Sequence, residues 1–472
     1  MSKDFIIKNG TIISMDPKIG VLYDADVLVG DDTLVSVGPH LVAPPGAEEI
    51  DASNCIVMPG FIDTHRHIWQ GAMRSVCADW SLMDYVRGIR MNAASAYTPD
   101  DIYAAQYHGA LEALDSGVTT VADYCHNINT PDHGHEAIRG LQDSNLRAVW
   151  SYGFNTPPLE DPAFKSRDER VSFARDLAKQ YFSDESSLLT LGISPEEVFL
   201  WGEENQNGIK QIELANELNA RVFWHCNGGS LTGERPRDVA ALESLGLLSS
   251  NMTLVHMHYT DDDEWAMVAN AGASVSFTPD TEMQMGMNWP LTDVARANNI
   301  TQSYGIDITS NNSADFFVCL RMALQQARCR EYYRINGETM ALGIPFSCAE
   351  ALAWGTIDGA KAIGMEDHIG SLTPGKQADL QLLRMDDLTT IGWDKSNPEG
   401  AVIMQGQARN VDTVMVSGRL VKRHGQMLAD IPYACSLLSD ANERITREVN
   451  SRGGYLLPLE EALSKVSETA RN

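Results

Sequence analysis

The sequence predicts an α/β fold, a (β/α)8 TIM-type barrel with a small β-sandwich domain that is built from both chain ends. Between residues 55 and 365, short apolar runs alternate with longer helical patterns, as in β/α units around a parallel sheet. Short alternating segments broken by glycine and proline turns precede this region, and similar segments follow it. A chain of 472 residues is long enough for a large barrel and a satellite domain.

Eight apolar, partly β-branched runs are the predicted barrel strands. They span residues 56–65, 118–124, 147–153, 188–193, 221–225, 253–258, 274–278 and 301–307. Helical patterns at 99–116, 167–182, 208–219 and 262–271 fill four of the intervals between them. The number of units, rather than any single segment, predicts that the barrel closes.

The chain is therefore divided into four predicted parts. Residues 1–54 form the N-terminal part of the β-sandwich, and residues 55–365 form the barrel. Residues 366–425 complete the sandwich with strands that resemble those of the N-terminal part. Residues 426–472 show a helical pattern with an acidic bias and are expected to be a C-terminal helical extension.

The charge balance limits the possible partners. Lysine and arginine total 36 against 64 aspartates and glutamates, a net charge of 36 − 64 = −28, which repels nucleic acids and anionic lipid surfaces. Eight scattered cysteines without a C-x-x-C pair suggest reduced core residues. The N-terminus lacks the pattern of a secretory signal. We expect a cytoplasmic homo-oligomer that acts on a small-molecule substrate, without nucleic acid or membrane partners.

Histidines and one aspartate fall at predicted strand ends. His65 and His67 end the first strand, and residues i and i+2 of a strand project to the same face. By itself, this H-x-H pair is equally consistent with polar residues that end a buried strand. However, His225 ends the fifth strand, His256 lies in the sixth and Asp307 ends the eighth. Functional side chains of such barrels collect at the C-terminal strand ends, so the set predicts a metal site.

Several motifs give the sequence a family resemblance. They are M-P-G-F-I-D-T-H-R-H at 58–67, G-V-T-T-V-A-D at 117–123, the histidines of strands five and six, and G-S-L-T-P-G-K-Q-A-D at 370–379. With these motifs the chain resembles the amidohydrolase superfamily, in its cytosine-deaminase-like and atrazine-chlorohydrolase-like branch. The patterns T-H-R-H-x-W-Q and P-D-T-E-M-Q-M-G-M-N-W-P look closer to hydrolases of phenylurea and thiocarbamate (molinate) compounds.

The resemblance implies one divalent metal ion per subunit. Zinc is expected, with iron, cobalt or manganese as alternatives. The implied metal ligands are His65, His67, His225 and Asp307. Three neutral imidazoles and one carboxylate leave such an ion able to bind and acidify water. Residues 188–201 contain no lysine that could be carboxylated to bridge a second metal, so one ion is expected.

The resemblance also implies catalytic roles. Asp307 would take the proton of the attacking water, and His256 would stabilise developing charge. Deaminases of this branch carry H-x-x-E after the fifth strand, whereas Gly228 stands in place of that glutamate here. Glu282 is either a relocated acid-base group or a solvent-exposed loop acid. The predicted catalytic residues are Asp307, His256 and Glu282, and the predicted substrate contacts are Trp69, Gln70, Asn227 and Glu282.

The missing glutamate favours a particular bond. Hydrolytic deamination of an aromatic ring needs a proton on the ring nitrogen, which Gly228 cannot donate. A urea, carbamate or amide already offers a carbonyl oxygen that can be polarised. The sequence therefore predicts hydrolysis of a carbonyl carbon-nitrogen bond in a small, largely apolar molecule. The alternatives are a deaminase or dechlorinase of a purine, pyrimidine or triazine, and a catalytically inactive scaffold.

Overall fold

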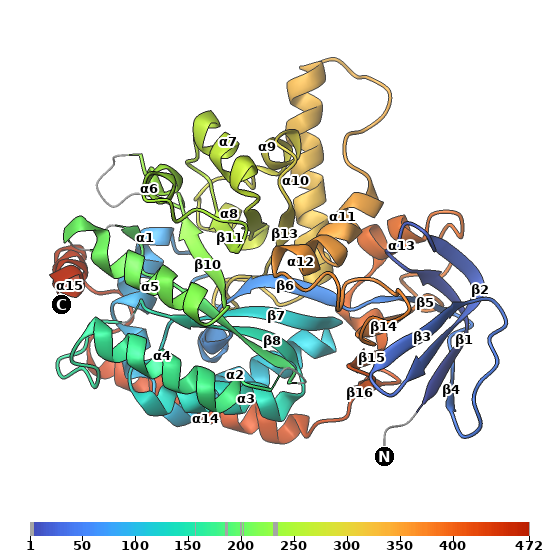
Figure 1. Ribbon diagram of the computed structural model, residues 1–472, viewed down its shortest axis with the longest axis horizontal. Coiled ribbons are helices and arrows are strands. Elements are labelled where there is room, and N and C mark those ends of the chain that lie inside the picture. Colours follow the sequence, from blue (N-terminus) through green and yellow to red (C-terminus); the bar gives the residue numbers. More distant parts are fainter. Residues whose placement is uncertain are drawn as a thin grey trace.

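Eight parallel strands form the barrel of the computed structural model (Figure 1). The structure describes residues 4–155, 157–184, 187–198, 201, 203–229 and 235–471, with only the backbone for 466–471. In spatial order the strands run consecutively, and a parallel bridge between Arg66 and Asp307 joins the first to the chain just beyond the last. They are β6 (Phe61–Arg66), β7 (Val118–Cys125), β8 (Arg147–Gly153), β9 (Leu189–Ser194), β10 (Arg221–Cys226), β11 (Met252–His256), β12 (Ser274–Phe277) and β13 (Gln302–Tyr304). The predicted barrel is confirmed.

Helices follow the strands and cover the outside of the barrel. Their starts carry the expected signals: at Thr98, a capping box with Asp101 and a proline at the first helical position begin α2. The four predicted helical patterns correspond to α2, α4, α5 and α7. The long helices are α2 (Pro99–Asp115), α3 (Pro131–Ser144), α4 (Arg167–Tyr181), α5 (Gln206–Glu217), α7 (Asp262–Ala271) and α10 (Phe316–Asn336). The shorter ones are α6 (Asp238–Ser244), α8 (Pro279–Gln284), α9 (Thr292–Ala297), α11 (Cys348–Trp354), α12 (Ile357–Ala362) and α13 (Pro398–Gln405).

A separate mixed sheet of nine strands forms the small domain, as predicted, from both chain ends. Its central pairing is between β5 and β14, which lie antiparallel with Val57 opposite Leu382. The strands are β1 (Phe5–Ile13), β2 (Val21–Gly30), β3 (Thr33–Gly38), β4 (Glu48–Asp51), β5 (Cys55–Pro59), β14 (Leu380–Arg384), β15 (Val411–Val416), β16 (Arg419–Arg423) and β17 (Gln426–Met427). A core of apolar side chains from both ends holds this sheet together.

The first predicted strand, 56–65, is in fact two strands. Residues up to Pro59 belong to the small sheet as β5, and the chain enters the barrel as β6 after Gly60. A Cβ atom at Gly60 would overlap the side chain of Thr119, so this close approach requires glycine. One continuous apolar run thus contributes a strand to each of two sheets. Its composition alone does not predict this division.

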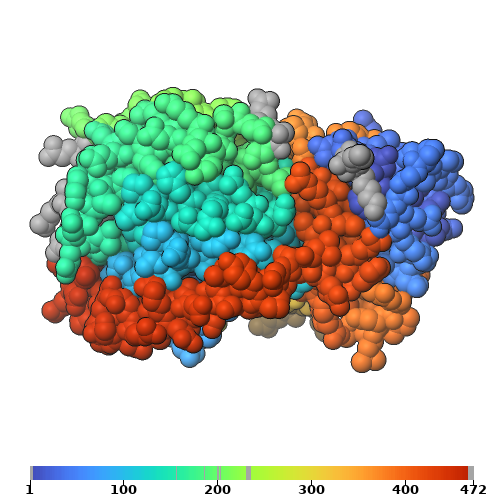
Figure 2. All heavy atoms as spheres, turned by 90° about the horizontal axis from the view of Figure 1, so that it is seen from below, coloured from blue at the N-terminus to red at the C-terminus, as the bar shows by residue number. Residues whose placement is uncertain are grey.

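Two helices form the C-terminal part of the chain, α14 (Ile431–Ser451) and α15 (Leu459–Arg471). Helix α14 lies along the barrel beside α2, where it appears as a continuous band in the space-filling view (Figure 2). Asn442 donates a hydrogen bond to the carbonyl of Ala72, and Arg444 pairs with Asp101 of α2. The described helices include none that is long and apolar enough to cross a membrane. The homo-oligomer stays a prediction.

Candidate active site

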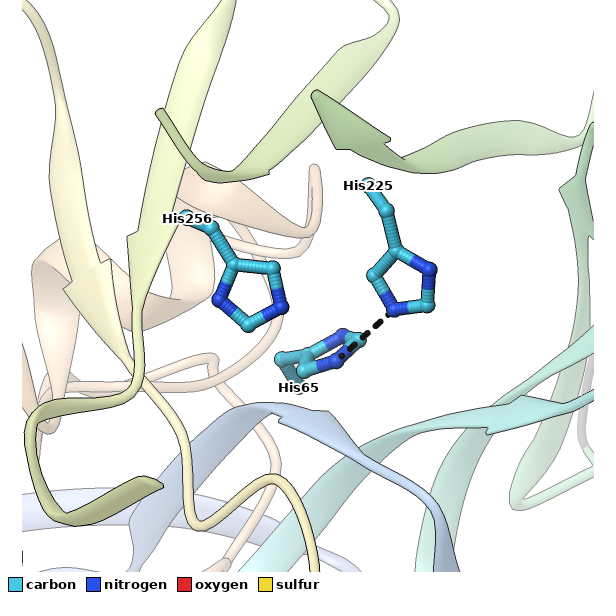
Figure 3. Close-up of side chains that lie close together, drawn as sticks. All are labelled: His65, His225 and His256. Atoms are coloured by element: carbon cyan, nitrogen blue, oxygen red, sulfur yellow. Dashed lines mark hydrogen bonds between the residues drawn. The ribbon is translucent and has the colours of Figure 1, made fainter. Parts of the chain in front are cut away.

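Three histidines and an aspartate converge at the C-terminal ends of the barrel strands. His65 lies in β6, His67 follows it, His225 lies in β10, and Asp307 lies beyond β13. His65 Nε2 lies 3.4 Å from Asp307 Oδ1. It also lies 3.4 Å from His225 Nε2, and His256 lies beside these two histidines (Figure 3). His67 Nε2 lies 3.5 Å from the same Asp307 oxygen. The structure thus brings together all four residues that were expected to bind the metal.

The spacing of these donor atoms fits a metal ion. Zinc-nitrogen bonds of about 2.0–2.1 Å in a tetrahedron place neighbouring donor atoms about 3.3 Å apart. Two facing imidazole nitrogens, as in His65 and His225, repel unless a cation or proton lies between them. The donors fall into two overlapping groups that share His65, one with His67 and Asp307 and the other with His225 and His256. The donor set therefore fits one divalent ion.

Electrostatics favour the protonation states that a metal requires. Burial lowers the pKa of His67 to about 3 and takes the pKa of His225 well below its ordinary value, so both imidazoles are neutral. His67 Nδ1 donates a 2.7 Å hydrogen bond to the carbonyl of Tyr124, which leaves Nε2 free to ligate. Burial would raise the pKa of Asp307, but the hydrogen bond with His65 and the electrostatic effects of His65, His256 and His67 together lower it.

Backbone geometry fixes two of the key side chains. Asp307 and His256 both adopt the left-handed region, with φ values of 65° and 77°. Side chains other than glycine rarely adopt this region, and such strain clusters at functional sites. These turns end the predicted strands earlier than expected, so β11 ends at His256 and β13 at Tyr304. They also direct both side chains toward the centre of the site.

A second group of polar side chains lies behind His256. Its Nδ1 lies 3.2 Å from Glu282 Oε1, and that oxygen also accepts a 2.8 Å hydrogen bond from the backbone N–H of Thr278. The hydroxyl of Thr278 lies 3.3 Å from Glu282 Oε1 and 3.4 Å from Asp307 Oδ2. Although burial lowers the pKa of His256, the hydrogen bond to Glu282 and the charge of Asp307 raise it overall. The network thus connects all three predicted catalytic residues.

Glu282 is fully buried, so it is not the solvent-exposed loop acid that the sequence left open. The imidazole of His256 lies between Glu282 Oε1 and the predicted metal ligands. Its Nδ1 faces Glu282, and its ring stacks on that of His225 with centroids 5.4 Å apart. Glu282 therefore acts on His256 rather than directly on the metal ligands.

The three other predicted substrate contacts are fully buried. Trp69 donates through Nε1 to His126, and Gln70 bonds to Tyr85 and Ser310. The amide of Asn227 is occupied by Thr260, Glu264 and the backbone of Asp238. The structure therefore places all three in the supporting layer of the site, where protein groups already satisfy their polar atoms.

Sequence reasoning missed several residues of the site. His126 follows β7 and stacks on His67 with ring centroids 4.2 Å apart and an angle of 3° between the planes. Tyr124 stacks on His225 in the same way at 4.3 Å. Glu197 follows β9 and lies 3.7 Å from His225 Nδ1. The rule that barrel sites gather at strand ends applies equally to all three, and it was the one available signal for them.

The fold and the four-ligand centre define a metal-dependent hydrolase of the barrel class. The chain belongs to the amidohydrolase family, because the model of that family matches residues 56–421. It is 26% identical over 387 residues to the 5-methylthioadenosine/S-adenosylhomocysteine deaminase of Symbiobacterium thermophilum. The alignment covers 80% of this chain and 84% of the relative. It is 24% identical over 409 residues to the 5'-deoxyadenosine deaminase of Methanobrevibacter smithii, covering 85% and 89%.

Solved structures share the whole fold. An adenosine deaminase from Xanthomonas campestris with bound zinc superposes with a TM-score of 0.82 at 23% identity, covering 94% of this chain and 98% of that one. The atrazine chlorohydrolase TrzN from Arthrobacter aurescens TC1, complexed with zinc, gives a TM-score of 0.80 at 23% identity, covering 93% and 100%. The protein is thus an amidohydrolase, consistent with action on carbon-nitrogen bonds other than peptide bonds. The finer likeness to phenylurea and thiocarbamate hydrolases stays a prediction.

Proposed function

We propose that this protein is a zinc-dependent hydrolase that deaminates an N-heterocycle, replacing a ring amino group with oxygen from water and releasing ammonia. The observation that carries this proposal is the hydrogen-bonded network of Asp307, Thr278, Glu282 and His256 beside the metal ligands. The near full-length relatives named as nucleoside deaminases support the same reaction class. The sequence-based alternative, a ring deaminase or dechlorinase, therefore fits better than the main prediction.

The residues of the chain divide the proton transfers between them. A bound zinc ion would acidify the attacking water and hold it near the substrate. Asp307 Oδ2 accepts the proton that this water loses as its oxygen bonds to the ring carbon. His256, with Nδ1 held by Glu282, presents Nε2 on the opposite side of its ring, where it can donate a proton to the ring nitrogen. Asp307 then passes the proton that it took from the water to the amino group, the carbon-nitrogen bond breaks and ammonia leaves, while the hydroxyl proton of the adduct returns to His256 as the carbonyl forms.

His256 and Glu282 together can supply the proton for the ring nitrogen, for which other deaminases of this branch have a glutamate where this chain has Gly228. The main sequence prediction, cleavage of a urea, carbamate or amide, rested on the lack of a group able to protonate a ring nitrogen. The pairing of His256 with buried Glu282 provides such a group from the ends of β11 and β12. The relatives named above are deaminases and do not support the urea prediction.

Product analysis in isotope-labelled water tests the proposal. Zinc-loaded enzyme is incubated with aminated purines, pyrimidines and triazines, with their chlorinated counterparts, and with phenylureas, thiocarbamates and anilides. We expect ammonia together with a heterocycle that carries the labelled oxygen. Chloride release without ammonia would make the protein a dechlorinase, and amine release from ureas alone would restore the first prediction. Either result would overturn the deaminase proposal.

A further inference from the structure

Arg90 is a buried cation with few partners. It ends the π-helix η2 (Val86–Arg90) and is 9% exposed. Its guanidinium donates one long hydrogen bond, 3.4 Å from Nη2 to the carbonyl of Asn155. Within the described part of the chain, it forms no ion pair with a carboxylate. By contrast, the buried guanidinium of Arg147 pairs with Asp379 at 2.7 Å. No nitrogen of Arg90 is among the described buried polar atoms without a partner, so the nitrogens that make no hydrogen bond border open space in which a further acceptor can bind.

The guanidinium lies close to the metal centre. Asn155, whose carbonyl it contacts, donates through Nδ2 to Glu197 Oε1 at 2.9 Å, and this same oxygen lies 3.7 Å from His225 Nδ1. Arg90 is therefore connected to a metal ligand through two side chains.

The surroundings of Arg90 are accessible from the inside of the site. The side chain of Glu197 retains 27% of its surface and that of His225 retains 17%, although both lie deep in the protein. A small molecule can therefore approach these groups. Arg90 lies between β6 and α2 and contacts Asn155, which follows β8 and bonds to Glu197 after β9, whereas His256 and Glu282 stand at the ends of β11 and β12, across the barrel.

The C-terminal segment holds η2 in this position. Arg87 Nη1 donates to the carbonyl of Leu457 at 3.0 Å, and Asn92 Nδ2 donates to the carbonyls of Gly454 and Tyr455 at 2.9 and 2.8 Å. Met91 packs with Leu457 and Ala462 in a small apolar cluster. These contacts fix the backbone on both sides of Arg90. A π-helix at this point is consistent with a functional role, because such turns often occur at functional sites.

We propose that Arg90 binds a carboxylate on the substrate, so that the molecule turned over is an N-heterocycle with an acidic substituent. The N-heterocycle in this substrate rests on the proposed function, whereas its carboxylate is inferred from Arg90. A planar guanidinium pairs with a carboxylate through two parallel hydrogen bonds. The strongly negative chain would otherwise repel such a substrate, so a local cation is needed for its capture. The substrate is then less apolar than the sequence predicted.

Binding measurements on matched ligands test the inference. The probes are aminopyrimidine, aminopurine and aminotriazine carboxylates, each with its carboxamide, whose binding to the zinc-loaded enzyme is measured; the Arg90→Gln variant separates capture by Arg90 from attraction of the carboxylate to the metal. We expect at least one carboxylate to bind roughly 10-fold or more tightly than its carboxamide, as a charge-assisted hydrogen bond does. Arg90→Gln should abolish this preference, and Arg90→Lys should restore only part of it.

Arg139 supplies a matched control. It lies on α3 with 48% of its side chain exposed and pairs with Glu136, so Arg139→Gln removes the same charge far from the metal ligands. This variant should keep the carboxylate preference. Equal binding of all carboxylates and carboxamides by the wild type, or a preference that survives in Arg90→Gln, would overturn the inference. Circular dichroism of Arg90→Gln checks that the variant is folded.

The two proposals fail in different ways. Ureido acids, which combine a urea with a carboxylate, are included with their amides in turnover assays of the zinc-loaded enzyme. If only ureido acids are hydrolysed, and Arg90→Gln removes the preference for them, the ring assignment fails while the role of Arg90 stands. If neutral aminated rings are turned over as fast as acidic ones, and Arg90→Gln has no effect, the role of Arg90 fails while the proposed function stands.

Discussion

The backbone N–H of Asp307 donates to the carbonyl of His65 at 2.9 Å, and the side chains of these two residues lie 3.4 Å apart. The same contact therefore closes the barrel between its first and last strands and brings together two metal ligands. His67 adds a second backbone bond by donating to the carbonyl of Asp307 at 2.7 Å. A metal ion bound by these predicted ligands would therefore couple metal binding to closure of the barrel.

Loss of any one ligand should remove both metal and activity. His65→Ala, His67→Ala and Asp307→Ala each delete a donor and expose the remaining ones to mutual repulsion. We expect metal content, measured on purified protein, to fall with turnover in all three. Because the metal binds only the folded state, its removal by a chelator should also lower the Tm of the wild type. A variant that keeps both metal and rate would show that its residue is not a ligand.

His256→Ala should separate catalysis from metal binding. The side chain of His256 contacts the substrate side of the site and is held by Glu282, whereas the other donors suffice for the ion. We expect most of the metal to remain while turnover falls by roughly 100-fold or more, as it does when a charge-stabilising donor is removed. Metal loss equal to that of His65→Ala would instead make His256 a ligand.

Glu282→Gln tests whether the buried acid acts through His256. The amide keeps the volume and can still bond to the imidazole, but it removes the negative charge that favours protonated His256. We expect kcat to fall by roughly 10-fold to 100-fold, as for other groups that orient an active-site histidine, with KM and metal content nearly unchanged. Thermal unfolding provides the check on folding. An unchanged kcat would exclude Glu282 from the reaction.

Helix α14 should stabilise the barrel through its buried face. Ile445 is fully buried on this helix, which packs against α2 and the turn that follows β6. Ile445→Ala leaves a cavity and should lower the free energy of unfolding by about 2–5 kcal/mol. Glu443 is exposed on the same helix, so Glu443→Ala should change the free energy of unfolding by less than about 0.5 kcal/mol. Similar values for the two variants in denaturant unfolding would contradict this packing.

The sequence predicted those features that depend on local patterns. Alternating strand and helix patterns indicated the barrel, and histidines at strand ends indicated where the ligands converge. The division at Gly60 was not predictable, because it depends on the side chain of Thr119, which is distant in the sequence. Neither were the roles of Arg90 and Glu197, because both face the site only after η2, the ends of β8 and β9, and the C-terminal segment have packed together.

The most direct test of the account compares kcat/KM of the zinc-loaded enzyme on an aminated heterocycle with kcat/KM on a phenylurea or thiocarbamate. Ammonia release is followed for the first substrate and amine release for the second, with a metal-free sample as the blank. The account predicts that the best heterocycle is turned over at least roughly 100-fold more efficiently, since removing a fitted proton donor costs about this factor. It also predicts that no ammonia forms without metal. A higher kcat/KM on the urea or thiocarbamate, or ammonia release that persists in metal-free enzyme, would contradict it.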